Sequence, residues 1–185
     1  MSGNTGFQFK YNLAGRTSGI QRSFIINNSA TVTVGDMVIL SSGYVAVCPN
    51  NTPIMGVVVG FTDSNGIDLA SSRKTLTGSG ASYTASTRTV VAGSDNSTTD
   101  YLRAIIDVDP FSVWSAAPDA AIGTTPAAIL KGQYTDLVAS AGDQPAENGA
   151  GSTQAQLFIW GLDPEDSTKG LYSIAQHQVW GWTKV

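Results

Sequence analysis

The chain has 185 residues, of which only 13% are charged, and its formal net charge is −4 at neutral pH. Binding to nucleic acid without sequence preference draws its affinity from Lys and Arg on phosphates, so this composition argues against a nucleic-acid partner. No stretch reaches the length of a membrane-spanning helix, and the first residues lack the apolar core of a signal peptide. We therefore expect synthesis in a cytoplasm and no membrane partner.

The composition also indicates the fold class. Ser, Thr, Gly, Ala and Asn are abundant, and long stretches with apolar residues at helical spacing are few. This favours β structure with extended loops. A chain of this length can form one domain with a full core, and we expect one.

The first 22 residues predict an extended segment. Four apolar residues occupy alternate positions and would share one face of a strand: Phe7, Phe9, Tyr11 and Leu13. Three basic residues are the only charges before Asp36: Lys10, Arg16 and Arg22. Residues 1–35 thus carry +3, and the remaining seven basic and fourteen acidic residues carry −7. Two interpretations stay open: a first strand followed by a solvated loop, or an N-terminal arm, residues 1–22, that lies on a neighbouring subunit.

The stretch from Val34 to Phe61 predicts a β-meander. Three apolar runs are separated by two turns: Met37–Leu40, Tyr44–Cys48 and Ile54–Phe61. Gly43 can adopt the positive φ that closes a tight hairpin, and the Pro- and Asn-rich segment 49–53 forms the second turn. The third run is almost wholly apolar, so we expect both of its faces to be covered, as in a barrel wall rather than an open edge.

Further strands are predicted on both sides of this meander: Phe24–Ile26, Ala30–Val34, Tyr101–Val113, Tyr134–Val138, Gln154–Gly161 and Leu171–Trp182. The Ser/Thr/Gly/Ala tract from Leu69 to Thr99 interrupts the pattern, and its local β-formers, Tyr83 and Thr89-Val90-Val91, predict a long projecting hairpin or excursion. The expected architecture is all-β: residues 23–185 form one small β-barrel or sandwich with long loops, and an extended N-terminal arm precedes it.

Residues that could carry chemistry are isolated in the sequence. Cys48 lies in an apolar run, which favours a small buried side chain over a reactive thiol. Residues 63–68 contain closely spaced oxygen ligands, but Asn-Gly and the missing distal Glu favour a plain turn over a calcium loop. Asp107 and Asp109 have a spacing suited to acid–base work, yet Asp109 fits a strand end before proline better, and His177 alternates with Gln in a solvent-facing pattern. We expect no catalytic residue, no metal and no cofactor.

Several segments resemble the head decoration (cement) proteins of tailed bacteriophages. The central ones are Gly35-Asp36-Met37-Val38-Ile39-Leu40, Gly43-Tyr44-Val45 and Met55-Gly56-Val57-Val58-Val59-Gly60. Similar later segments are Asp107-Val108-Asp109-Pro110, Gly132-Gln133-Tyr134-Thr135-Asp136-Leu137, and Ser152-Thr153-Gln154-Ala155-Gln156-Leu157 leading to Leu162-Asp163. The N-terminal segment and the tract 69–99 fall outside the resemblance.

The resemblance implies a small β-barrel without enzymatic activity, often a homotrimer, on the outer surface of the virion capsid. Its partners would be the major capsid protein, whose neighbouring copies it clamps, and other copies of itself. If residues 1–22 form an arm, the capsid or subunit docking residues would be Phe7, Phe9, Lys10, Tyr11, Leu13, Arg16 and Arg22.

Two alternatives belong to other classes. A phage tail or fibre domain that binds a host glycan would be supported by exposed tryptophans among Trp114, Trp160, Trp180 and Trp182. A hydrolase of cell-wall polysaccharide would be supported by carboxylates clustered around His177 in a cleft.

Overall fold

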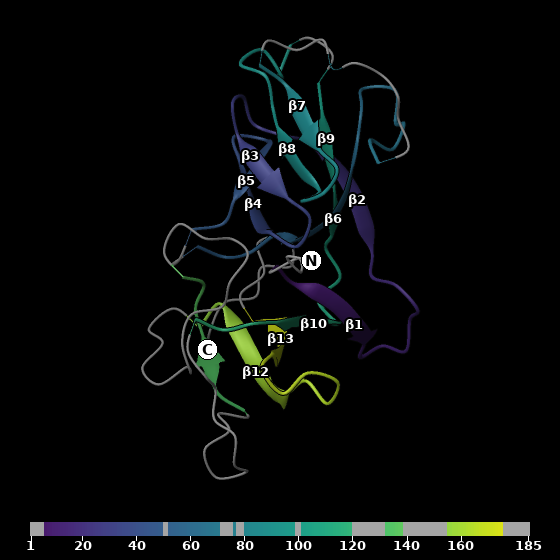
Figure 1. Ribbon diagram of the computed structural model, residues 1–185. Coiled ribbons are helices and arrows are strands. Elements are labelled where there is room, and N and C mark those ends of the chain that lie inside the picture. The colour runs from purple at the N-terminus through teal and green to yellow at the C-terminus, as the bar shows by residue number, and fades with distance from the viewer. Residues whose placement is uncertain are drawn as a thin grey trace.

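The computed structural model describes residues 6–49, 52–70, 76, 80–98, 101–119, 132–138 and 155–175. Within these ranges the chain is all-β, as expected, with thirteen strands and no helix (Figure 1). The strands are β1 Gln8–Asn12, β2 Gln21–Ile25, β3 Thr31–Thr33, β4 Met37–Ser41, β5 Tyr44–Val47, β6 Gly56–Thr62, β7 Ser82–Thr84, β8 Thr89–Val91, β9 Arg103–Asp107, β10 Ser112–Ala116, β11 Tyr134–Thr135, β12 Leu157–Leu162 and β13 Gly170–Ile174. No described segment is a helix long and apolar enough to cross a membrane.

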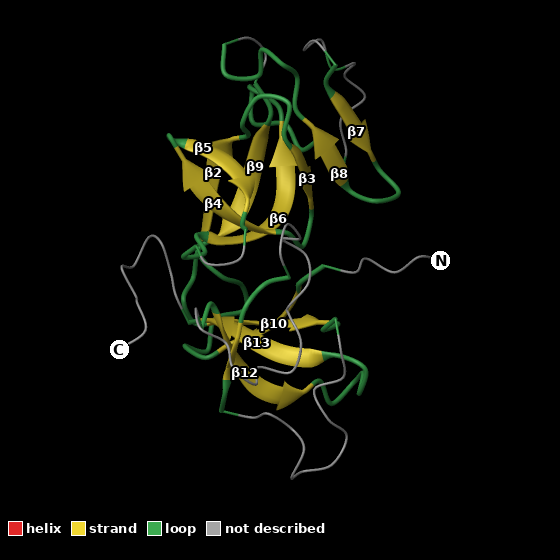
Figure 2. Cartoon of the chain, turned by 90° about the vertical axis from the view of Figure 1, so that its left-hand side faces the viewer, coloured by secondary structure: helices red, strands yellow, loops and turns green. Residues whose placement is uncertain are grey.

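The strands form three antiparallel sheets in two lobes (Figure 2). Sheet A has the order β1-β10-β13-β12-β11 and forms one lobe. Sheet B, with the order β2-β9-β6-β4-β5, and sheet C, with the order β3-β8-β7, form the other. None of the three closes into a barrel, which agrees with a sandwich and not with the expected barrel wall. Sheet B is nevertheless curled, so that its two edges approach each other. Ile26, directly after edge strand β2, forms a parallel bridge with Val45 of the other edge strand, β5.

The predicted meander is present as β4, β5 and β6. Gly43 has φ +87° in the turn between β4 and β5, the conformation that its lack of a Cβ permits. Both faces of β4 and β6 are covered, since Val38 and Val58 pack in one core while Met37 and Val57 pack in the other. The apolar third run therefore serves two cores at once, as its composition predicted.

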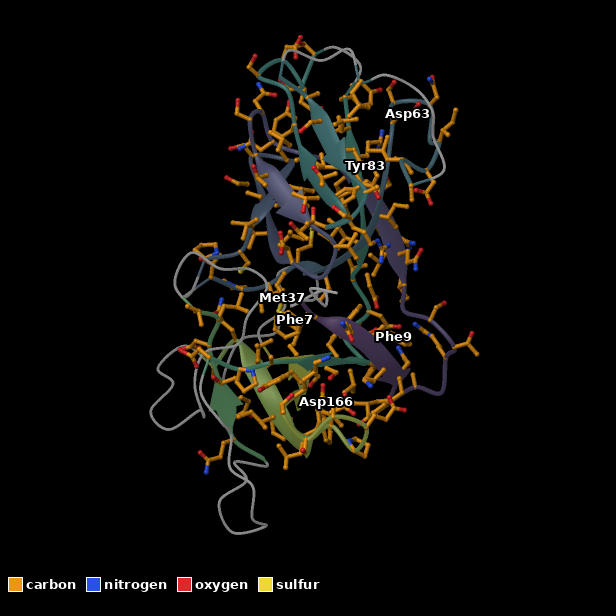
Figure 3. The ribbon with its side chains drawn as sticks, in the orientation of Figure 1. Phe7, Phe9, Met37, Asp63, Tyr83 and Asp166 are labelled. Atoms are coloured by element: carbon orange, nitrogen blue, oxygen red, sulfur yellow. The ribbon has the colours of Figure 1, made fainter. Side chains whose placement is uncertain are left out.

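The described residues form two hydrophobic cores: one lies within the lobe of sheets B and C, and the other joins that lobe to sheet A. The first core lies between sheets B and C; its fully buried side chains include Ile26, Val32, Val38, Val45, Met55, Val90, Ala104 and Ile106. The second core lies between sheet A and the near side of sheet B; its buried side chains include Phe7, Met37, Cys48, Ile54, Val57, Trp114, Leu137, Leu157, Ile159 and Tyr172. Phe7 and Met37 meet at the junction of the lobes (Figure 3).

The described part of the N-terminal segment is not a free arm. Residues 8–12 form β1, which pairs with β10, and Phe7 is only 2% exposed in the second core. The amide of Phe7 donates to the carbonyl of Gly35, 2.9 Å away, and Phe9 packs edge-on against Trp114. The first two members of the alternating apolar face, Phe7 and Phe9, thus pack on the chain's own core, so the first-strand interpretation describes this segment.

The tract 69–99 was expected to form a long projecting hairpin or excursion, and its described residues include a hairpin, β7–β8, that pairs with β3 in sheet C. Strand β8 pairs with β3, and Leu69, Val90 and Ala92 are buried in the first core. Tyr83 of β7 packs edge-on against Phe61, with ring centroids 6.4 Å apart. A few Val and Tyr side chains at alternate positions are enough to dock a polar hairpin onto a curled sheet.

Candidate functional site

The described residues contain no group of three or more His, Cys, Asp or Glu side chains that could hold a metal ion. Asp107 and Asp109, which have a spacing suited to acid–base chemistry, are instead parts of a hydrogen-bonded corner. The Asp107 carboxylate accepts from the amide of Asp109 at 2.9 Å and from the hydroxyl of Ser112 at 2.8 Å. Burial raises the pKa of Asp107, against the effect of these two hydrogen bonds. The geometry is that of a folded corner between β9 and β10.

Asp109 holds the connection between β1 and β2. Its buried Oδ2 accepts from the side-chain amide of Asn12 at 2.9 Å and from the guanidinium of Arg16 at 2.8 Å. Gly19 packs so closely on Asp107 that a Cβ there would overlap the carboxylate oxygens. The two hydrogen bonds to Asp109 bridge more than ninety positions of sequence. They fix the loop 13–20 against the β9–β10 corner.

Lys10 joins β1 to the turn after β12. Its ammonium lies 2.9 Å from a carboxylate oxygen of Asp163 and 2.7 Å from one of Glu165. The pKa of Lys10 is raised, mainly by its hydrogen bond to Glu165 and next by its hydrogen bond to Asp163. Burial by itself would raise the pKa of Asp163, but hydrogen bonds from the Ser115 hydroxyl, the Glu165 amide and Lys10 hold it below its ordinary value. Lys10 is therefore an anchor for β1 rather than a free docking charge.

The remaining predicted docking residues stay on the surface. A β-bulge between Phe9 and Tyr11 shifts the register of β1 on β10. Beyond it Asn12 points inward, whereas Tyr11 and Leu13 are 42% and 48% exposed. The amide of Leu13 donates to the carbonyl of Phe111, which places the 43% exposed Phe111 beside it. Three large apolar side chains at the adjoining ends of β1 and β10 are thus exposed to solvent.

Basic residues continue from this trio toward sheet B. Arg16, in the loop that leads to β2 and ion-paired with Asp109, and Arg22, in β2 itself, line an open hollow of about 720 Å³. We call the surface formed by Tyr11, Leu13, Arg16, Arg22 and Phe111 the β1–β2 surface. It retains four of the seven predicted docking residues. Phe111 was missed, although a large apolar residue directly after an Asp-Pro turn was the available signal.

A second exposed feature lies at β11 and β12, at the edge of sheet A opposite β1. Tyr134 is 41% exposed, and Phe158 and Trp160 are half-buried. The rings form an edge-to-face row, with centroid distances of 5.6 Å from Tyr134 to Phe158 and 4.9 Å from Phe158 to Trp160. Trp160 also donates to the hydroxyl of Ser173. Trp114, by contrast, is buried in the second core.

The other candidates have structural roles or lie outside the description. Cys48 is a buried free thiol, and burial raises its pKa to about 12, which confirms the inert interpretation. Residues 63–66 form a turn in which an Asp63 carboxylate oxygen accepts from the amides of Asn65 and Ile67, as predicted. His177, Trp180 and Trp182 lie outside the described residues, as do most of residues 71–79.

Comparisons of the chain with family models, with curated proteins and with solved structures give no match.

Proposed function

We propose that the protein is a structural virion protein that binds the outer surface of a tailed-phage capsid. It stabilises the shell by clamping neighbouring major capsid proteins, and it acts without catalysis or a cofactor. The observation that carries the proposal is the β1–β2 surface, where Tyr11, Leu13 and Phe111 are exposed and the adjoining segment that leads into β2 carries a hollow lined by Arg16 and Arg22. Exposed apolar groups gathered in a patch mark interaction sites more often than isolated ones do.

The support from the interior is of a different kind. The buried carboxylates Asp107, Asp109 and Asp163 each accept hydrogen bonds from backbone or side-chain donors. Those of Asp109 and Asp163 also connect segments far apart in sequence. Such groups give a rigid framework rather than a reactive centre. A rigid framework with a mixed apolar and basic surface suits a protein whose work is to hold other subunits together.

The test is co-sedimentation with empty shells assembled from the major capsid protein of the phage that encodes the chain. A triple variant, Tyr11→Ser, Leu13→Ser and Phe111→Ser, removes the apolar part of the surface. If each side chain contributes about 1 kcal/mol of apolar burial, binding weakens on the order of a hundredfold. Tyr134→Ser is the matched control, because Tyr134 is equally exposed but lies at the other edge of sheet A. Unchanged shell binding by the triple variant would refute the proposal.

We also propose that the protein forms a homotrimer when it binds the shell. A chain with few charges can bury surface against its own copies without stranding ionic groups. Three linked copies would multiply a modest contact at each β1–β2 surface into firm attachment. Native mass measurement at micromolar concentration checks this, and a monomer mass both free and on dissociated shells would contradict it.

A second candidate function is glycan binding by a tail or fibre protein. The row formed by Tyr134, Phe158 and Trp160 favours it, because exposed aromatic rings can stack on sugar rings. Trp160→Ala would then abolish binding to host surface polysaccharide in a calorimetric titration and leave shell binding intact. Shell binding without any binding of host polysaccharide would favour capsid decoration.

A further inference from the structure

Sheet B carries a hollow that the proposed function does not use. Strands β2 and β9, the end of β6 and the turn at residues 64–66 line an open hollow of about 510 Å³ on sheet B. Ile105 contributes an apolar floor, and Asn65 lies at the rim. Two arginines, Arg22 from β2 and Arg103 from β9, line the same hollow.

Arg103 is held in position before any ligand arrives. Its Nε donates to the hydroxyl of Ser23 at 3.0 Å, and Nη2 approaches the carbonyl of Ser23 at 3.4 Å. The guanidinium carbon also lies 5.8 Å from the centre of the Tyr101 ring, a cation–π distance. One side of the guanidinium is thus fixed on the protein. A fixed planar fork loses little entropy when it binds a carboxylate.

The charges of this hollow are not neutralised by carboxylates within the described residues. Lys10, Arg16 and Lys169 each form an ion pair. Arg22 instead donates to the carbonyl of Gln21, and the Arg103 guanidinium contacts Ser23 and the Tyr101 ring. Two cations at one hollow repel each other unless an anion joins them. The site is therefore complementary to negative charge, although the chain as a whole is acidic.

We propose that this hollow binds the carboxylate side chains of an acidic polypeptide segment. A polypeptide fits better than a nucleic acid, whose affinity needs many more cations than two. The Ile105 floor can pack against the methylene stems of Glu side chains while Arg22 and Arg103 bind the carboxylates. Arg22 also belongs to the β1–β2 surface, so the hollow continues that surface onto sheet B. The inference rests on the proposed function only for the identity of the protein that supplies the segment.

The experiment uses the full ¹⁵N-labelled chain and a hexaglutamate peptide as probe. Backbone amide shifts of Ser23, Asn65 and Arg103 are expected to move during the titration, and hexaglutamine should leave them unchanged. Arg103→Gln should weaken peptide binding about tenfold, as expected for loss of a charge-assisted hydrogen bond. Arg88→Gln is the matched control, since Arg88 contacts the carbonyl of Val59 and does not line this hollow.

Three results would overturn the inference: no shift of these amides with hexaglutamate, equal shifts with hexaglutamine, or equal binding by the Arg103→Gln variant. Inorganic sulfate binding as tightly as the peptide would also overturn it, because a lone anion would then suffice. Peptide binding does not involve shells. A chain that binds hexaglutamate but not shells therefore refutes only the proposed function, and one that binds shells but not the peptide refutes only this inference.

Discussion

The two halves of the N-terminal segment have the same sequence pattern and opposite environments. Phe7 and Phe9 pack on the second core, whereas Tyr11 and Leu13, the next two members of the alternation, are exposed. The change occurs at a β-bulge, where one extra residue turns the strand over. Alternation thus identifies the strand, whereas pairing with β10 decides where along β1 the apolar face stops being buried.

The largest effect is expected when both halves of the N-terminal segment are removed. A truncation lacking Ser2 to Arg22 deletes β1, the Phe7 side chain and the loop held by Asp109. The arm hypothesis, drawn from the sequence alone, predicts that such a chain folds normally. We now expect it to lose cooperative unfolding, as monitored by circular dichroism during a urea titration. A truncated chain with a sharp, wild-type-like transition would show that β1 is dispensable.

Phe7→Ala should have the next largest effect. The ring is buried and packs edge-on against Tyr172 with centroids 6.1 Å apart, so its removal leaves a cavity. The expected loss is about 3–5 kcal/mol in the free energy of unfolding, measured by urea titration. Tyr11→Ala, from the exposed half, is the control and should cost less than about 1 kcal/mol. Equal losses would mean that the two halves do not differ as described.

Gly19→Ala tests how the second half is fixed. A Cβ at this position would overlap the Asp107 carboxylate, which is held by Ser112 and the Asp109 amide. Displacing that carboxylate should cost about 2 kcal/mol of stability. Ser18→Ala, in the same exposed loop, should cost almost nothing. If the two variants unfold at the same urea concentration, the close packing on Asp107 is not required.

Asp163→Asn tests the anchor of the first half through its pH dependence. The pKa of Asp163 is lowered in the fold, so its stabilisation is present above the ordinary Asp pKa and is lost as pH falls through the folded value. The variant should lose about 1–3 kcal/mol at pH 7 and less at pH 2–3. An equal loss at both pH values would contradict the ionised role.

Asp107 supplies the opposite case in the same experiment. Burial raises its pKa, so its favourable contribution is present at low pH and is lost as pH rises through the folded value. Asp107→Asn should therefore become less harmful, relative to the wild type, as pH rises from 4 to 7. A penalty that grew over this range would reverse the assignment.

The smallest effect on stability is expected from the exposed half. Tyr11→Ser with Leu13→Ser should change the free energy of unfolding by less than about 1 kcal/mol, because both side chains are nearly half exposed. Shell binding should nevertheless fall clearly, as measured by co-sedimentation. A variant that lost stability and binding in parallel would place these residues in the fold rather than on a docking surface.

The sequence by itself determined the elements whose signals are local. The all-β class, the three strands of the meander and the turn at Gly43 follow from composition, apolar runs and turn residues that act within a few positions. The turn at residues 63–66 and the inert burial of Cys48 belong to the same group.

Only the tertiary structure decided the pairings between distant segments. The bulge that exposes Tyr11, the docking of β8 on β3, and the bonds from Asp109 to Asn12 and Arg16 depend on neighbours that are remote in sequence. The apolar trio of the β1–β2 surface likewise depends on the hydrogen bond that places Leu13, directly after β1, beside Phe111, directly before β10. Turn chemistry and side-chain alternation act over two to four residues, whereas strand register is set by whichever distant strand lies alongside, and that register fixes which faces remain exposed.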